Sequence, residues 1–143
     1  MITAVDTNVI VDVVGGDARF GPASLAALGG CRAEGRLIIG SVVAAEVSSL
    51  FPSSELAIEA FRRIGLEFVA ETLASSFAAA ISWRAYRGSG GARSRLVGDF
   101  LVGAHAQVLA DRLLTRDRGF YRTYFRDLTV LEPSPATPRG GGS

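Results

Sequence analysis

The sequence predicts an α/β fold in which a parallel β-sheet is covered by helices on both faces. Short apolar segments rich in β-branched residues alternate with longer segments that carry helix start and stop signals. The short segments are mainly apolar, which is typical of strands that are buried on both faces. Strands that alternate with helices form parallel sheets whose crossovers are right-handed, so few topologies remain.

Five segments fit the strand pattern, and the first of them ends directly at Asp6. The carboxyl ends of parallel strands meet at one edge of a sheet. Ligands bind at that edge where the strand order reverses. The expected strands are 2–5, 37–39, 66–69, 113–115 and 129–131.

Seven segments between these strands carry helix signals. Ser41 is expected to be an N-cap, and Ser53 or Ser54 to begin a helix that Gly65 ends. The glycine-rich segment 88–95 is expected to be a loop. The expected helices are 7–14, 23–34, 41–50, 53–64, 73–87, 99–112 and 118–124, the last being a short helix or a turn.

The 143 residues are enough for one domain with a sizeable core. Residues 1–132 are expected to form it, and the segment 133–143, rich in Pro, Ser, Thr and Gly, to be a disordered tail. The single cysteine, Cys31, excludes an internal disulfide, and no segment has the roughly 18 apolar residues of a membrane span. No signal peptide is recognisable, so we expect a cytoplasmic protein without membrane contacts.

The charge composition is unusual because all 15 basic residues are arginine. Arginine suits bidentate contacts to phosphate, although genomic base composition explains the bias equally well. The absence of lysine excludes a P-loop and a phosphorelay receiver site, and it argues against a haloacid-dehalogenase-like phosphatase.

Four acidic residues are candidates for a functional site, namely Asp6, Glu46, Asp99 and Asp117. Asp6 follows the first strand and Asp117 follows the fourth, so the two meet if these strands are neighbours. Glu46 shares a helix face with apolar residues, where a carboxylate is rarely buried unless it is paired or binds a metal. Taken singly, the three aspartates are also explained as helix caps, and Glu46 as a partly exposed acid.

Together the four acids predict a cation site. Carboxylates in one crevice repel each other unless cations neutralise them. Oxygen ligands without cysteine or histidine favour Mg²⁺ or Mn²⁺ over zinc. Because Mg²⁺ keeps positions for water and substrate phosphate, the set indicates an enzyme that cleaves phosphodiester bonds.

The segments around these acids resemble the acidic motifs of PIN-domain ribonucleases, and their order and spacing look most like VapC toxins. The resemblance spans about residues 2–131 and implies a PIN-like three-layer αβα fold with a five-stranded parallel sheet, order 3-2-1-4-5. It also implies Mg²⁺ or Mn²⁺, hydrolysis of RNA, a homodimer and a cognate VapB-like antitoxin. The segments that carry it are Asp6-Thr7-Asn8, the segment around Glu46, Asp99 to Ala104, and Leu114 to Phe120.

The resemblance also assigns roles to single residues. Asp6 and Asp99 are expected to be the main metal ligands, with Glu46 and Asp117 completing the site directly or through water. Side chains next to these acids are expected to orient them by hydrogen bonds. These residues are Thr7, Asn8 and Thr115.

Weaker signals surround the site. Arg93, Arg95, Arg116 and Arg118 could bind RNA phosphates, and the aromatic residues near Arg118 could stack on bases or pack on the core. The only histidine, His105, is expected to pack or to meet a partner. Apolar helix residues could form core, a dimer face or an antitoxin groove, namely Leu50, Phe51, Leu56, Ile58 and Phe61.

A competing interpretation is a PIN-like module that binds RNA or a protein without catalysis. Loss of one of the four acids would favour it, but all four are present.

Overall fold

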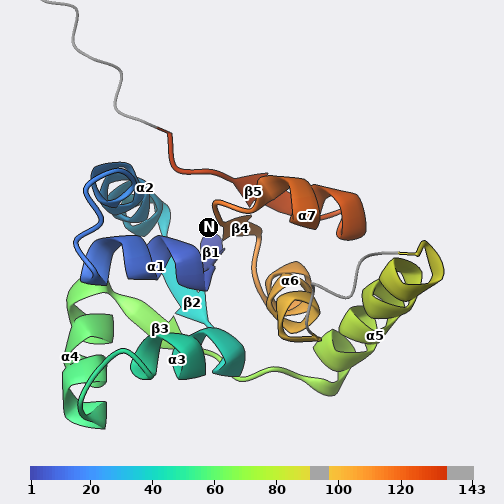
Figure 1. Ribbon diagram of the computed structural model, residues 1–143, viewed down its shortest axis with the longest axis horizontal. Helices are drawn as coiled ribbons and strands as arrows, with labels where there is room; N and C mark the ends of the chain where they lie inside the picture. Colours follow the sequence, from blue (N-terminus) through green and yellow to red (C-terminus); the bar gives the residue numbers. More distant parts are fainter. Residues whose placement is uncertain (91–96, 135–143) are drawn as a thin grey trace, which may run out of the picture.

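The computed structural model describes residues 1–90 and 97–134, and its centre is a five-stranded parallel sheet. The strand order is β3-β2-β1-β4-β5, which confirms the predicted order (Figure 1). The register pairs Ala4 of β1 with Ile38 on one side and Leu113 on the other. The strands are β1 (Ile2–Val5), β2 (Arg36–Ile39), β3 (Leu66–Phe68), β4 (Arg112–Leu114) and β5 (Thr129–Leu131).

Helices lie on both sides of this sheet, so the predicted three-layer arrangement is confirmed. Figure 1 shows α1 to α4 on one side of the strands and α5 to α7 on the other. Right-handed crossovers require this division, because the chain moves first from β1 toward β3 and then back toward β5. The helices are α1 (Thr7–Val14), α2 (Gly21–Glu34), α3 (Ser41–Ser48), α4 (Ser54–Ile64), α5 (Leu73–Gly88), α6 (Val97–Leu109) and α7 (Arg118–Tyr124).

Several helix ends follow from their sequence. The Ser53 hydroxyl accepts a hydrogen bond from the Leu56 amide at the start of α4, and Gly65 ends this helix with φ +86°. Thr72 and Ser75 form a reciprocal capping box at the start of α5. These contacts give backbone groups at the helix ends their hydrogen-bond partners.

Several predicted boundaries are shifted; for example, α2 begins at Gly21, α3 ends at Ser48 and α6 begins at Val97. The N-cap of α3 is Gly40, and Ser41 is already helical. The Ser41 hydroxyl does not cap the helix, because it donates to the Glu71 carboxylate at 2.7 Å, as the Ser41 amide also does. Helix α6 ends at Leu109 and not near Arg112, since Arg112 belongs to β4 and pairs there with Thr3.

The core is apolar on both sides of β1. Val9 and Ile10 of α1 are fully buried under one face of the sheet. Beyond the other face, Phe100 of α6 is fully buried, with its ring centroid 5.1 Å from the rings of both Trp83 and Phe120. Among the described residues, no helix has the length and apolar character that crossing a membrane requires.

The ring of Phe125 approaches the backbone of α6 closely at Gly103, which explains a glycine in the middle of this helix. A Cβ atom at this position would overlap the ring of Phe125, which is itself buried. The absence of a side chain therefore lets the segment after α7 pack directly on the backbone of α6.

We expect Gly103→Ala to lower the free energy of unfolding by about 1–3 kcal/mol, because the new methyl group displaces the Phe125 ring. The matched control is Gly29→Ala in α2, where a Cβ meets nothing within 4 Å and helix propensity favours alanine. Urea denaturation measures both. Equal stability changes in the two variants would contradict this packing.

Candidate metal-dependent active site

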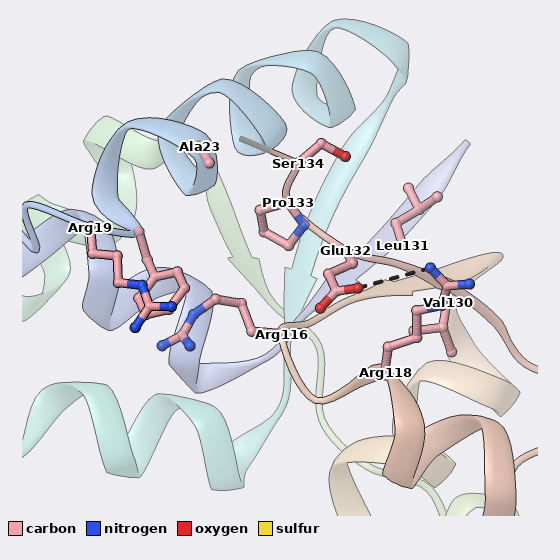
Figure 2. Close-up of a pocket in the computed structure, with 10 residues that line it drawn as sticks. Arg19, Ala23, Arg116, Arg118, Val130, Leu131, Glu132, Pro133 and Ser134 are labelled. Atoms are coloured by element: carbon pink, nitrogen blue, oxygen red, sulfur yellow. Dashed lines mark ion pairs between the residues drawn. The ribbon is translucent and has the colours of Figure 1, made fainter. Parts of the chain in front are cut away.

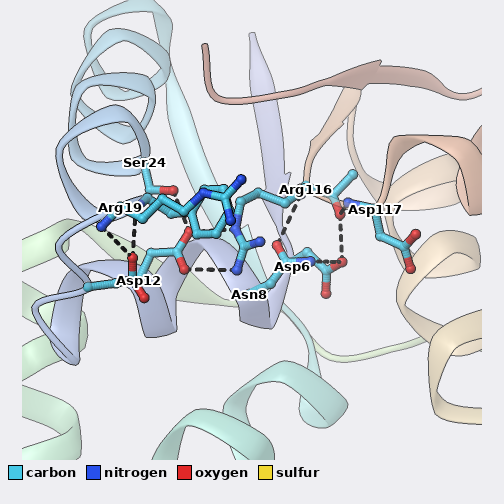
Figure 3. A network of polar contacts seen from close by, with 10 residues as sticks. Asp6, Asn8, Asp12, Arg19, Ser24, Arg116 and Asp117 are labelled. Atoms are coloured by element: carbon cyan, nitrogen blue, oxygen red, sulfur yellow. Dashed lines mark hydrogen bonds and ion pairs between the residues drawn. The ribbon is translucent and has the colours of Figure 1, made fainter. Parts of the chain in front are cut away.

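The four acids lie at the carboxyl edge of the sheet, on four different helices or their caps. Asp6 is the N-cap of α1, and Asp117 occupies the N-cap position of α7. Glu46 lies in α3, and Asp99 lies in the first turn of α6. Figure 3 shows Asp6 and Asp117 beside the turn that leaves β4.

Asp6 is the buried centre of this group, with only 8% of its surface exposed. One carboxylate oxygen accepts a hydrogen bond from the Thr7 amide at 2.8 Å. The other oxygen accepts from the Thr115 hydroxyl at 2.8 Å and, at 3.5 Å, from the Asn8 side-chain amide. The β1–β4 pairing places Thr115 within reach, because the Asp6 amide donates to the carbonyl of Leu114.

The environment of Asp6 opposes its ionisation. Burial raises the pKa of Asp6 above its ordinary value of 3.8, and the negative charge of Glu46 adds to the rise. Hydrogen bonds from Thr115, Thr7 and Tyr121 act in the opposite direction but do not cancel the effect of burial. A nearby cation would offset this cost.

Tyr121 of α7 lies next to Asp6, and its hydroxyl is affected by three of the acids. Its side chain is 2% exposed, and its hydroxyl donates a hydrogen bond to Asp6. Burial raises the pKa of the Tyr121 phenol, and the negative charges of Asp6, Asp99 and Asp117 raise it further. All three aspartates therefore lie close enough to one hydroxyl to influence it.

Thr7 and Thr115 connect Asp6 to Glu46 and Asp117, respectively. The Thr7 hydroxyl donates to Glu46 at 3.2 Å, while its amide bonds to Asp6. The Thr115 hydroxyl donates to Asp6 and accepts from the Asp117 amide at 2.9 Å. These contacts join Asp6 to Glu46 and Asp117, whereas Asp99 is related to them through its electrostatic effect on the Tyr121 phenol.

Glu46 differs in burial from its expected setting. The inward face of α3 consists of buried Val43 and Val47, whereas Glu46 and Leu50 are exposed. Because its side chain is exposed to solvent, Glu46 needs no metal to compensate for burial.

The donors of this crevice fit a hard divalent cation, because they are carboxylate oxygens without cysteine or histidine. Within residues 1–90 and 97–134, however, no three His, Cys, Asp or Glu side chains form a ready metal-binding group. The ligand roles of Asp6, Glu46, Asp99 and Asp117 therefore remain predictions.

A buried ion pair beside the crevice was not anticipated from the sequence. Asp12 of α1 is 3% exposed, and Arg116 donates two hydrogen bonds to its carboxylate, at 2.7 and 2.9 Å. Ser24 of α2 donates to the same carboxylate at 2.7 Å. The available signal was an aspartate among the valines of α1, since a buried acid requires a partner.

This ion pair holds the turn that carries Asp117. The Arg116 amide donates to the Asn8 side-chain oxygen at 3.1 Å, while its guanidinium is bound to Asp12 (Figure 3). Arg116 thus attaches the Thr115–Asp117 turn to α1 at two points.

The arginines, the histidine and the aromatic residues singled out in the sequence lie in different environments. Arg118 lies 3.9 Å from Glu132, while Arg93 and Arg95 lie outside the described residues. His105 is buried, with Nε2 2.7 Å from the Val69 carbonyl, which fits packing. The aromatic residues of 120–125 pack against the core, since Phe120, Tyr121 and Phe125 are buried and Tyr124 is half-buried.

The apolar helix residues that could form a partner surface differ in their exposure. Leu50, Leu56 and Ile58 are exposed, whereas Phe51 and Phe61 are half-buried against the core. A second exposed apolar row on α5 was not anticipated, and it consists of Leu73, Phe77 and Ile81.

Known proteins share this fold. Residues 3–126 match the PIN domain family. No curated protein sequence matches the chain significantly. The structure is similar to VapBC2 from Rickettsia felis bound to a promoter DNA fragment, with a TM-score of 0.72 and 19% identity over 94% of this chain and 100% of that one.

Two further solved structures are similar. VapBC-1 from nontypeable Haemophilus influenzae gives a TM-score of 0.69 with 16% identity over 92% of this chain and 98% of that one. FitAcB from Neisseria gonorrhoeae gives a TM-score of 0.66 with 18% identity over 93% and 98%, respectively. At these identities the likeness establishes the fold.

We expect Arg116→Gln to lower the free energy of unfolding by about 2–4 kcal/mol, because the buried Asp12 carboxylate loses its charged partner. The control is Arg36→Gln, which breaks an exposed pair with Glu67 and should cost less than about 1 kcal/mol. Chemical denaturation compares the two. A loss no greater than that of Arg36→Gln would show that Arg116 is not a structural anchor.

Proposed function

Because the chain belongs to the PIN domain family, we propose that it is a metal-dependent endoribonuclease of the VapC toxin type. The observation that carries the proposal is the set of hydrogen-bonded acids at the carboxyl edge of the sheet. Thr7 joins Asp6 to Glu46, and Thr115 joins Asp6 to Asp117. The negative charges of Asp6, Asp99 and Asp117 all act on the Tyr121 phenol. A charged group of this kind lowers stability unless a cation or substrate compensates, so a function accounts for it better than a structural role.

In this proposal Asp6 and Asp99 are the main ligands of Mg²⁺ or Mn²⁺, and Glu46 and Asp117 complete the site directly or through water. A cation bound there supplies polarisation of the scissile phosphate and acidification of an attacking water. The substrate class is RNA, as the resemblance to VapC toxins implies.

The supporting residues act by fixing the acids. The Thr115 hydroxyl and the Thr7 amide hold the two oxygens of Asp6 in place, and Asn8 adds a longer contact. The Thr7 hydroxyl keeps Glu46 turned toward the crevice. Rigid carboxylates bind a cation with less loss of side-chain entropy, which favours affinity and correct geometry.

We also propose a cognate VapB-like antitoxin and a homodimer. The similar solved structures are VapBC2, VapBC-1 and FitAcB, and this similarity supports a VapB-like protein partner. Exposed apolar residues on α4 and α5 provide surface for such contacts.

We expect Asp99→Asn to reduce RNA cleavage at least about 100-fold, beyond the roughly 10- to 100-fold loss typical of a supporting residue. Purified protein would be incubated with total cellular RNA and Mg²⁺ or Mn²⁺, with EDTA as a second arm. Total RNA is used because a narrow target would be missed with one oligonucleotide. Sequencing the product ends identifies the cleavage sites.

The matched control is Asp127→Asn, which neutralises an exposed aspartate outside the crevice and should leave cleavage unchanged. Discrete products that vanish with EDTA and with Asp99→Asn support the ribonuclease. Cleavage that persists in Asp99→Asn removes this residue from the mechanism. Intact RNA in every arm, with RNA binding retained, favours a non-catalytic RNA-binding module.

A further inference from the structure

A cleft beside the acidic crevice carries three arginines. It has a volume of about 910 Å³. The start of α2 lines one side, and the segments that follow β4 and β5 line the other. Figure 2 shows Arg19 and Arg116 at one side of this cleft and Arg118 with Glu132 at the other. Apolar side chains line the space between them, including Val130, Leu131 and Pro133.

The arginines on the α2 side are held in place before any ligand arrives. The guanidinium carbons of Arg116 and Arg19 lie 4.0 and 4.8 Å from the ring centroid of Phe20. Asp17 accepts hydrogen bonds from the backbone amides of Arg19 and Phe20 at 2.9 and 2.7 Å, which fixes the turn. Stacking on Phe20 limits the side-chain entropy lost on binding. The charge of Arg116 is already paired with Asp12, so the positive charge that this side offers a ligand is that of Arg19.

The cleft shares the turn after β4 with the proposed active site, although none of the four acids lines it. Arg116 and Arg118 flank Asp117 in the chain, so one turn forms a wall of the cleft and carries an acid of the crevice. The Arg116 amide is also bonded to Asn8, which contacts Asp6. A strand bound at the acids would therefore pass next to the turn that also carries Arg116 and Arg118.

Among the described residues that line the cleft, Glu132 is the one carboxylate. It lies 3.9 Å from Arg118, and both side chains are about 40% exposed, at 43% and 42%. A pair this long and this exposed contributes little stability, so a phosphate could replace Glu132 as the partner of Arg118. Glu132 would then weaken the binding of a polyanion.

We propose that this cleft binds the phosphodiester backbone of the RNA strand next to the scissile bond, through Arg19 and Arg118, with Arg116 as the fixed wall. The proposal rests on the ribonuclease function above and names the part of the site that holds the substrate. Arginine forks match phosphate geometry, and backbone contacts position a strand without reading its sequence.

The test measures binding apart from cleavage. A fluorescent single-stranded RNA of random sequence is titrated with Asp99→Asn protein in EDTA, and anisotropy gives Kd at several salt concentrations. Adding Arg19→Gln should weaken binding about fivefold at 0.1 M salt, because one phosphate contact contributes about 0.7 to the log–log salt slope. Adding Glu132→Gln should strengthen binding by a few-fold through the same electrostatic effect.

Matched controls come from the exposed Arg36–Glu67 pair near the opposite edge of the sheet. Arg36→Gln and Glu67→Gln change the net charge by the same amounts and should leave Kd and the salt slope unchanged. Equal effects at the two pairs would mean that only total charge matters, and this would overturn the cleft assignment.

The alternative occupant is an acidic peptide, with poly-glutamate as its probe. If Arg19→Gln and Glu132→Gln alter poly-glutamate binding but not RNA binding, the RNA assignment is overturned. The experiment distinguishes the two hypotheses. If the wild-type protein cleaves RNA but Arg19→Gln leaves Kd unchanged, only the assignment of the cleft is refuted. If no protein binds or cleaves RNA, the cleft assignment and the ribonuclease function are both refuted.

Discussion

Burial of one carboxylate, Asp6, is the constraint on which the site depends. A charged group at the end of β1 with 8% exposure costs free energy unless hydrogen bonds and opposite charge compensate for lost water. Pairing of β1 with β4 supplies the Thr115 hydroxyl, and packing of α7 supplies Tyr121. The raised pKa of Asp6 shows that these contacts do not fully compensate, so ionisation of Asp6 opposes folding of the metal-free protein.

The same constraint connects the crevice with its surroundings. Asp117 has to be held near Asp6 although their charges repel, and the Asp12–Arg116 pair fixes the intervening turn to α1. Arg116 then also forms the wall of the arginine cleft, against the ring of Phe20. One ion pair therefore positions an acid of the crevice and a cation of the neighbouring cleft.

Much of this was predictable because it depends on local signals. Apolar runs and turn residues predicted all five strands, and strand order follows from the crossover rule together with the family resemblance. The Asp12–Arg116 pair was missed because it joins residues 104 positions apart, and short-range patterns carry no such information. Glu46 was expected on an apolar face, but burial depends on how α3 is rotated against the sheet, which periodicity leaves open.

The central claim is that acids from separate elements form one cation site, and calorimetric titration with Mn²⁺ tests it most directly. Glu46 and Asp117 lie on α3 and at the start of α7, far in sequence from Asp6, so Glu46→Gln and Asp117→Asn are the informative variants. We expect each variant to weaken Mn²⁺ binding at least about tenfold, while Asp127→Asn leaves it unchanged. Wild-type affinity in both Glu46→Gln and Asp117→Asn would contradict a shared site.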